Sequence, residues 1–191
     1  MAKLISILLM MAGLSQLAFA QNDSAVTRSL MASPEALMEP TSGPLLSAQE
    51  LESKRWCYSV EEALADPTKV YKLSLAGKKL KDLPEALFRL VNLQVLNLSD
   101  NKLRSLPPQI AKLQNLQVLV LTDNKINSLP EEMKELNHLL RLYLGQNRLM
   151  EMPAWVGGLS KLRYLDLSRN YVTLYDLERS RARLRNCEIV F

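Results

Sequence analysis

The chain has 191 residues and a formal net charge of +4, and 48% of its residues are hydrophobic. This mild charge argues against a nucleic-acid-binding protein, because such proteins concentrate basic residues on one face. The sequence has neither a metal-ligand cluster nor a phosphate-binding loop, so we expect no cofactor.

The first twenty residues have the pattern of a secretory signal peptide. Lys3 gives a short basic start, an apolar run follows up to Leu17, and the small residues around Ala20 form a cleavage site before Gln21. The apolar run is short for a membrane span, which needs about 20 apolar residues. We therefore expect residues 1–20 to be removed, leaving a secreted, periplasmic or extracellular chain with no stable membrane span.

Two further segments precede the main domain. Residues 21–46 carry no sustained period and are rich in Ser, Pro, Ala and Thr, which predicts a flexible lead-in. Residues 47–69 are expected to form an N-terminal helical cap, because hydroxyl and carboxylate residues stand twice at the spacing of a helix capping box. The two pairs are Ser47 with Glu50 and Ser59 with Glu62.

A near-copy of one phrase then recurs every 23 residues. The copies open at Val70, Leu93, Leu116, Leu139 and Leu162. A fixed period in this range indicates a solenoid, because each unit is too small to bury its own apolar face and must stack on its neighbours.

The pattern within one period predicts a strand followed by a return. With Leu93 as repeat position 1, positions 1, 4, 6, 11, 14 and 21 are apolar in all four full copies. Positions 3 to 7 alternate apolar and polar residues, which is typical of a half-buried strand. A proline follows position 14 and fixes a helical turn or irregular return on an outer wall. These prolines are Pro84, Pro107, Pro130 and Pro153.

Repeat position 9 is an asparagine in the later copies. A side-chain amide offers two donors and an acceptor, so stacked copies are expected to tie the turn of one coil to the next. The residues are Asn101, Asn124, Asn147 and Asn170. The first copy has Lys78 instead, as expected for an end repeat with no coil before it.

The full phrase, LxxLxLxxNxLxxLPxx(I/M/V)xxLxx, resembles the leucine-rich repeat proteins, in the short Leu-Pro form found in secreted bacterial members. The resemblance covers residues 70–191. It implies an α/β solenoid, a right-handed coil with a concave parallel β-sheet and short helical or irregular convex segments. It also implies five repeats and a truncated sixth strand, with Leu184, Cys187 and Ile189 at repeat positions 1, 4 and 6.

The fifth copy departs from the repeat and carries several basic residues. We interpret residues 175–183 as a helix that closes the C-terminal end. Its arginines form either a patch for an anionic partner or a solvated helix face, and we favour the solvated face. They are Arg179, Arg181, Arg183 and Arg185.

The two cysteines are not expected to form a disulfide with each other. Cys57 belongs to the N-terminal cap and Cys187 to the last strand. Strands stack about 4.8 Å apart, so five steps separate them by about 24 Å, whereas a disulfide needs α-carbons within about 7 Å. Cys187 should be a buried thiol, and Cys57 is either free or paired between molecules.

No catalytic set appears, and we expect a protein that is not an enzyme. His138 is the one histidine, and it falls at a polar corner of the repeat that Asn92, Asn115 and Lys161 also occupy. A surface loop residue fits this place better than a general base.

Binding is the remaining class of function, and the repeat predicts where it occurs. Repeat positions 3, 5 and 7 should point out of the sheet into solvent, and we call this surface the concave face. Valines there are unexpected, while Arg and Tyr are enriched in binding hot spots; the alternative is that Val merely suits a strand. The candidate residues are Val95, Asn97, Val118, Val120, Arg141, Tyr143, Tyr164 and Asp166.

Three functions remain open for this surface. We favour a secreted module that binds a protein partner. The alternative is a carbohydrate or cell-envelope glycan stacked on Tyr143, Tyr164 and Tyr171, and the third is a structural repeat without a partner. A basic row at repeat position 10 runs beside acidic residues at position 8, and we expect the two rows to neutralise each other. The basic row is Lys79, Lys102, Lys125 and Arg148, next to Asp100 and Asp123.

Overall fold

The computed structural model describes residues 45–191 apart from 174, 177 and 179–183. The described residues all belong to one compact unit. The predicted signal peptide, nearly all of the predicted lead-in and most of the predicted C-terminal helix lie outside the described residues, so these remain predictions. None of the helices that the structure describes has the length and apolar character needed to cross a bilayer.

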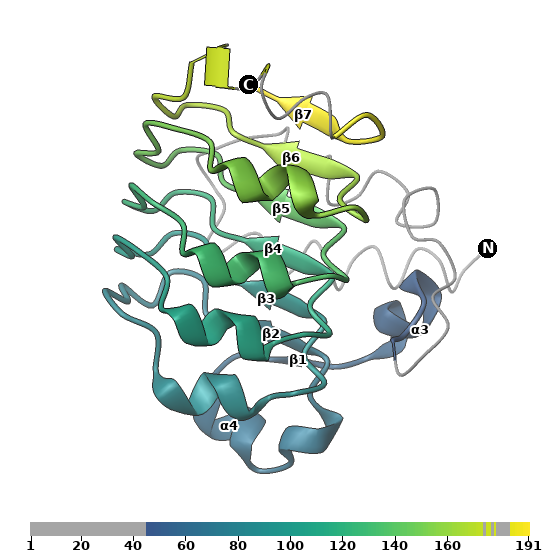
Figure 1. Cartoon of the computed structure of the whole chain (residues 1–191). Helices are drawn as coiled ribbons and strands as arrows, with labels where there is room; N and C mark the ends of the chain where they lie inside the picture. The colour runs from purple at the N-terminus through teal and green to yellow at the C-terminus, as the bar shows by residue number, and fades with distance from the viewer. Residues whose placement is uncertain (1–44, 174, 177, 179–183) are drawn as a thin grey trace, which may run out of the picture. The chain divides into compact units, whose positions relative to one another are not determined.

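Seven strands form one parallel sheet in chain order, as the repeat predicts (Figure 1). They are β1 (Trp56–Cys57), β2 (Lys72–Ser74), β3 (Val95–Asn97), β4 (Val118–Val120), β5 (Arg141–Tyr143), β6 (Tyr164–Asp166) and β7 (Glu188–Val190). From β2 to β6, equal repeat positions lie opposite each other, with Leu73, Leu96 and Leu119 in one row. The predicted parallel coil is therefore confirmed.

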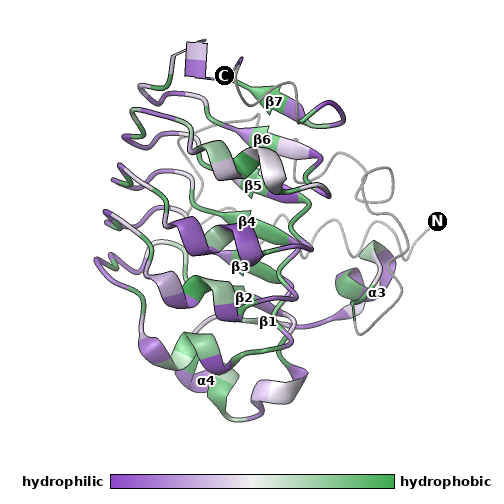
Figure 2. Cartoon of the chain, in the orientation of Figure 1, coloured by the Kyte–Doolittle hydropathy of each residue, from purple (hydrophilic) through white to green (hydrophobic). Residues whose placement is uncertain are grey.

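The apolar repeat positions make the core. Leu96, Leu119 and Leu142 are fully buried, and so are Leu98 and Leu121 at position 6. Figure 2 shows the hydrophobic colour along the middle strands and the hydrophilic colour over η5 and many of the outer turns. Because each leucine meets the matching leucine of the next coil, the repeats share one continuous apolar spine.

The return half of each full repeat is a short 3-10 helix that begins after the predicted proline. These helices are η3 (Glu85–Arg89), η4 (Pro108–Lys112), η5 (Glu131–Glu135) and η6 (Ala154–Gly158). Each proline is extended and stands at the N-cap, where its missing N–H leaves no hydrogen bond unmade. The chain thus turns onto the outer wall and packs one further apolar side chain inward, such as Ile110 or Met133.

The asparagines at repeat position 9 join neighbouring coils, as predicted. Asn124 Nδ2 donates to the carbonyl of Leu98 in the preceding repeat at 2.9 Å. Its Oδ1 accepts the backbone N–H of Leu103, also in the preceding repeat, at 3.0 Å. Asn101, Asn147 and Asn170 make the corresponding pairs of bonds. Each amide thereby satisfies backbone groups that the turn would otherwise bury without partners.

Repeat position 8 has a left-handed backbone, which the sequence analysis did not predict. The φ values there are 69° at Gly77, 53° at Asp100, 56° at Asp123, 57° at Gln146 and 55° at Arg169. Glycine adopts this conformation freely, and aspartate tolerates it better than most residues. Gly77, Asp100 and Asp123 therefore stand in this row for conformational reasons, and charge is a further reason only at the two aspartates.

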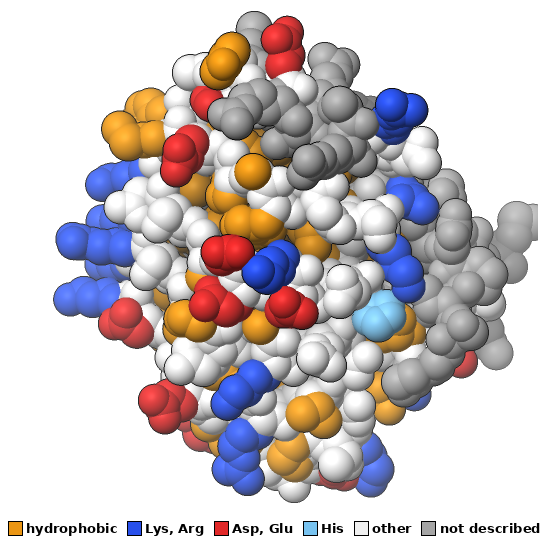
Figure 3. All heavy atoms as spheres, viewed as in Figure 1, with side chains coloured by type: hydrophobic (Ala, Val, Ile, Leu, Met, Phe, Trp, Pro, Cys, Tyr) orange, Lys and Arg blue, Asp and Glu red, His pale blue; other side chains and the backbone are white. Residues whose placement is uncertain are grey.

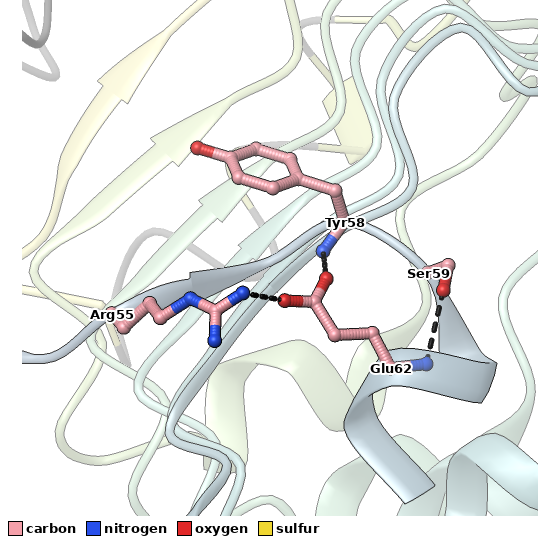
Figure 4. Close-up of polar contacts among 4 residues, drawn as sticks. All are labelled: Arg55, Tyr58, Ser59 and Glu62. Atoms are coloured by element: carbon pink, nitrogen blue, oxygen red, sulfur yellow. Dashed lines mark hydrogen bonds and ion pairs between the residues drawn. The ribbon is translucent and has the colours of Figure 1, made fainter. Parts of the chain in front are cut away.

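The described segment before the repeats contains two α-helices, α3 (Ala48–Ser53) and α4 (Val60–Leu64), and the 3-10 helix η2 (Pro67–Lys69). The capping box predicted at the start of α3 is complete. At α4 only half of the predicted box forms, because Ser59 accepts the N–H of Glu62 but the Glu62 carboxylate turns away from Ser59 (Figure 4). It accepts the N–H of Tyr58 and pairs with Arg55 instead.

The last strand is shifted relative to the prediction. β7 places Ile189, not Cys187, opposite Leu165 at repeat position 4. Leu184 is buried, while Cys187 and Ile189 are half-buried and pack against the core. The register differs by two residues because the return before β7 lacks the Leu-Pro pair that aligns the other coils.

Candidate functional site

The sheet brings the eight candidate residues into two adjacent rows. Repeat position 3 aligns Val95, Val118, Arg141 and Tyr164, and position 5 aligns Asn97, Val120, Tyr143 and Asp166. The rows run across β3 to β6 with no interruption. The rings of Tyr143 and Tyr164 lie 5.0 Å apart between centroids and are tilted by 41°, so they contact each other as an aromatic pair.

The expectation that this face points into solvent is wrong for most of these residues. Val95 and Asn97 are half-buried, but the other six are buried. Arg141 is 4% exposed and Tyr143 is 0% exposed. Strand periodicity distinguishes the two faces of a sheet, but it does not reveal whether another part of the same chain covers the outward face.

Residues of the segment before the repeats bury the concave face at its first strands. Lys72, at repeat position 3 of β2, is buried, and its Nζ donates to the carbonyl of Glu52 at the end of α3 at 3.3 Å. The same ammonium lies 5.3 Å from the ring centre of Trp56. Burial lowers the pKa of Lys72, and the nearby Glu52 raises it by less. The segment predicted to cap one end of the coil thus also reaches the concave face.

A pair of glutamines at repeat position 2 holds the chain just before α3. Gln94 Oε1 accepts the N–H of Leu46 at 3.0 Å, and Gln117 Nε2 donates to the Leu46 carbonyl at 3.0 Å. The two amides also bond each other at 2.8 Å. The sequence analysis did not predict this contact. The one available signal was a glutamine at repeat position 2 in two successive copies.

In the part of the chain that the structure describes, the centre of the concave face contains buried polar groups without hydrogen-bond partners. They are Arg141 Nε and Nη2, Tyr143 Oη, Ser99 Oγ and Thr122 Oγ1. Buried polar groups are normally paired, because leaving one unpaired costs about 1–3 kcal/mol, and more for a charge. The guanidinium of Arg141 is the group that most needs an acceptor, since it stays charged in proteins.

Because Gly145 has no side chain, the Asp166 carboxylate can lie against its backbone beside this centre. A Cβ at Gly145 would lie 2.7 Å from Asp166 Oδ2 and 3.0 Å from Ser168 Oγ. The other Asp166 oxygen accepts the N–H of Ser168 at 2.9 Å, and Asn97 makes the same bond to Ser99. Repeat position 5 therefore uses a side-chain oxygen to fix the end of the strand in two copies.

The other residues considered from the sequence lie away from this centre. Lys79, Lys102, Lys125 and Arg148 are exposed in the turns after the strands, beside exposed Asp100 and Asp123. Lys and Arg side chains gather along that side of the molecule in Figure 3. Tyr171 takes the same repeat position after β6 and is 68% exposed. It is therefore not on the strand rows with Tyr143 and Tyr164.

His138 and the cysteines have structural surroundings. His138 Nδ1 lies 3.1 Å from the Gln114 carbonyl, and Asn115 makes the matching contact to Val91 one coil earlier. Both cysteines are free thiols; Cys57 lies in β1, and Cys187 directly precedes β7 at the other end of the sheet. This separation fits the prediction of no disulfide between them, and Cys57 lies in a strand rather than in a helical cap. Burial raises the pKa of Cys187 to about 12.

No group of three or more potential metal ligands occurs within the described part of the chain. What the described face offers instead is an extended row of apolar, aromatic and hydrogen-bonding side chains. Such a row suits recognition of another chain along its length.

The stacked parallel coils, with a strand face on one side and short returns on the other, define a repeat solenoid. Within that class, the family model described as a leucine-rich repeat region matches residues 69–179. The chain belongs to the leucine-rich repeat proteins. Members of this family are typically protein-interaction modules.

Solved structures of similar chains come from bacteria and a plant. A leucine-rich repeat protein of Leptospira interrogans is 33% identical, with a TM-score of 0.65, over 78% of this chain and 40% of that one. Internalin C2 of Listeria monocytogenes is 26% identical, with a TM-score of 0.55, over 67% of this chain and 63% of that one. No curated protein matches the chain in sequence.

The third similar structure is a receptor. It is the leucine-rich repeat ectodomain of a plant membrane receptor kinase from Arabidopsis thaliana, in complex with CASPARIAN STRIP INTEGRITY FACTOR 2. It is 30% identical, with a TM-score of 0.52, over 64% of this chain and 18% of that one. This chain thus spans less than two thirds of the length of each of these three proteins.

Proposed function

We propose that the mature chain is a secreted, non-enzymatic module that binds a protein partner through the concave face. The observation that carries the proposal is the centre at Arg141 and Tyr143, where Arg141 Nε and Nη2 and Tyr143 Oη have no hydrogen-bond partner among the described residues. Arginine and tyrosine at the middle of a patch are the residues on which binding energy concentrates. The similar receptor ectodomain, solved in complex with its factor, supports recognition of a chain by this fold.

Secretion is part of the proposal and rests on the sequence of residues 1–20. The basic start, the apolar run and the small residues at the cleavage site are typical of a signal peptide. Expression of the full chain in its host should give a product that begins at Gln21, read by N-terminal sequencing. A product that keeps Lys3 would contradict the proposed cleavage of a signal peptide before Gln21.

No observation favours the glycan alternative. Sugars stack on open aromatic faces, whereas Tyr143 is 0% exposed and packs against Tyr164. Tyr171 is exposed but lies in a turn, apart from the other two rings.

The test is capture by the mature chain, residues 21–191, from the envelope and secreted proteins of its host. The Arg141→Gln variant should lower capture of a specific partner about tenfold or more, as expected for loss of a central charge-assisted contact. Glu132→Gln on η5 is the matched control, because Glu132 is exposed on the return side. Equal capture by wild type and Arg141→Gln would reject the concave face as the binding surface.

A further inference from the structure

The turns that follow the strands form a basic surface away from the concave face. In each turn, repeat position 11 is buried or half-buried, whereas positions 10 and 12 on either side of it are exposed in all five copies. We call these exposed positions 10 and 12 the turn strip. Six of its ten residues are basic and none is acidic, the basic ones being Lys79, Lys81, Lys102, Arg104, Lys125 and Arg148.

Neighbouring acidic residues do not cancel the charge of the turn strip. None of the ion pairs within the described part of the chain involves one of the six basic residues. Across repeat positions 8 to 13, the five copies hold eight basic and four acidic residues, a net charge of +4. This equals the net charge of the whole chain, so the excess positive charge of the protein is concentrated on the turns. Asp100 and Asp123 leave most of it uncompensated.

Backbone hydrogen bonds hold the turn strip in a fixed row. The N–H of Lys102 donates to the carbonyl of Leu80 in the preceding coil at 2.8 Å. Lys125, Arg148 and Tyr171 each make the corresponding bond to the coil before their own, at 2.8 to 2.9 Å. Because neighbouring strands lie about 4.8 Å apart, position 10 extends about 19 Å from the first copy to the fifth. The row is therefore an ordered surface rather than a set of independent loops.

The turn strip has apolar side chains at its C-terminal end. Met150 is 73% exposed and Tyr171 is 68% exposed. The bond from Tyr171 N–H to the Leu149 carbonyl places these two residues in adjoining turns. Figure 3 shows Lys and Arg side chains gathered at the left edge of the molecule and hydrophobic side chains above them. Solvation explains exposed charges but not this apolar end, and both Met and Tyr are common on binding surfaces.

We propose that the turn strip binds an acidic, extended segment of a partner protein. Carboxylates of the segment lie over the basic residues, and an apolar side chain packs against Met150 and Tyr171. Six extended residues span about 20 Å, which matches the length of the strip. Complementary charge steers such a segment to the strip and fixes its register. A polyanionic glycan would match the charge, but it has no apolar side chain for Met150 and Tyr171.

The turn strip contains none of the concave-face candidates. The inference therefore goes beyond the function proposed above, and either can fail without the other. Its test uses the mature chain, residues 21–191, and a dye-labelled peptide of six glutamates followed by leucine and phenylalanine. Binding is read by fluorescence anisotropy, and wild type should bind this peptide. Absence of binding at about 1 mM protein would overturn the proposal.

Charge reversal locates the binding surface. Lys102→Glu combined with Lys125→Glu should weaken peptide binding about tenfold or more, because two central contacts become repulsive. Arg89→Glu combined with Lys112→Glu is the matched control, since both residues are exposed on the return helices η3 and η4 and the change in net charge is the same. At physiological salt, charges beyond about 8 Å are largely screened, so the control should bind nearly as wild type does. Equal weakening by the two double variants would overturn the proposal.

The apolar end distinguishes a protein segment from other polyanions. Met150→Ser combined with Tyr171→Ser should weaken binding of this peptide about fivefold and leave binding of a peptide of eight glutamates unchanged. Val91→Ser, at another exposed apolar residue, is the control and should change neither. Heparin or single-stranded DNA that binds more tightly than the peptide, with no dependence on Met150 and Tyr171, would overturn the proposal in favour of a general polyanion surface.

Discussion

The hydroxyl of Tyr143 is a buried polar group that contributes nothing visible to the fold. The residue is 0% exposed, and its Oη has no hydrogen-bond partner among the residues described. A buried hydroxyl without a partner destabilises the protein by about 1–3 kcal/mol relative to an apolar group of the same shape. This cost is consistent with the proposal that Tyr143 contacts a partner.

We predict that Tyr143→Phe raises the free energy of unfolding by about 1 kcal/mol, because it removes an unpaired hydroxyl and keeps the ring. Urea denaturation of the mature chain measures this directly. Tyr171→Phe, at an exposed tyrosine, should change nothing. A loss of stability in Tyr143→Phe would mean that the hydroxyl has a partner in the free protein.

Gly145 is required by its neighbour rather than by its own backbone. Its Cβ would stand 2.7 Å from the Asp166 carboxylate, which real contacts do not allow. Gly145→Ala should therefore destabilise the protein by about 1–3 kcal/mol, as overpacking does. Asp166→Ala should relieve most of that effect in the double variant. Additive effects in a thermal double-mutant cycle would show that the clash is not the cause.

The raised pKa of the Cys187 thiol predicts how the stability of the protein changes with pH. Burial raises its pKa from 9.0 to about 12; the Arg163 charge opposes this, and Glu188 adds to it. The unfolded thiol ionises first, so the stability contributed by Cys187 is fully present below pH 9 and is lost as the pH rises toward 12.

Alkylation at pH 8.5 should therefore modify unfolded chains at Cys187 much faster than folded chains. In urea denaturation between pH 9 and pH 11, wild type should lose more stability than Cys187→Ala, which lacks the titrating group. Parallel pH profiles for the two proteins would contradict the raised pKa.

At the scale of one element, the asparagine row holds the turns of successive coils together. Asn124 bonds to Leu98 and Leu103 of the preceding coil and to Leu121 of its own. Asn124→Ala would leave at least two buried backbone groups without partners, so we predict a loss of about 2–4 kcal/mol. Asn170→Ala, in a half-buried copy nearer the C-terminal end, should lose less in the same urea titration. Equal losses would mean that burial does not set the strength of these bonds.

The strand and the return of each repeat could be predicted because their signals are local. Alternation around Leu96 and Leu119 gives the strand, and Pro107 or Pro130 gives the start of the return. The left-handed residue at position 8 was missed, although Gly77 followed by Asp100 in the same place was a usable signal. Charge pattern and backbone conformation favour some of the same residue types, and the sequence alone did not separate them.

For the whole molecule, periodicity predicted the strand order and the rows on the face, because a constant period aligns every copy with the next. It failed where the period ends. β7 pairs two residues away from the predicted register, since no Leu-Pro return precedes it. The burial of Arg141 and Tyr143 also could not be predicted, because the period gives the order of the strands but not what lies against their outward face.

Because all coils share one period, one complete coil can be removed while the remaining coils stay aligned. Deleting residues 116–138 removes one period of 23 residues and joins the end of the second copy to Leu139. The leucine, asparagine and proline positions all stay in register, and β3 then pairs with β5. Gly145 remains before Asp166, so no new clash arises there. We predict that the shortened chain still folds cooperatively. Its free energy of unfolding should be lower, because one interface between coils is lost.

Deleting residues 116–137 is the matched control, because it removes one residue fewer and shifts every later apolar position relative to the spine. Circular dichroism and thermal unfolding should show a cooperative transition for the 23-residue deletion and a broad or absent one for the control. Since both proteins lose nearly the same apolar surface, only alignment between coils distinguishes them. If both deletions unfold alike, the fold depends on something specific to the third copy rather than on the repeat.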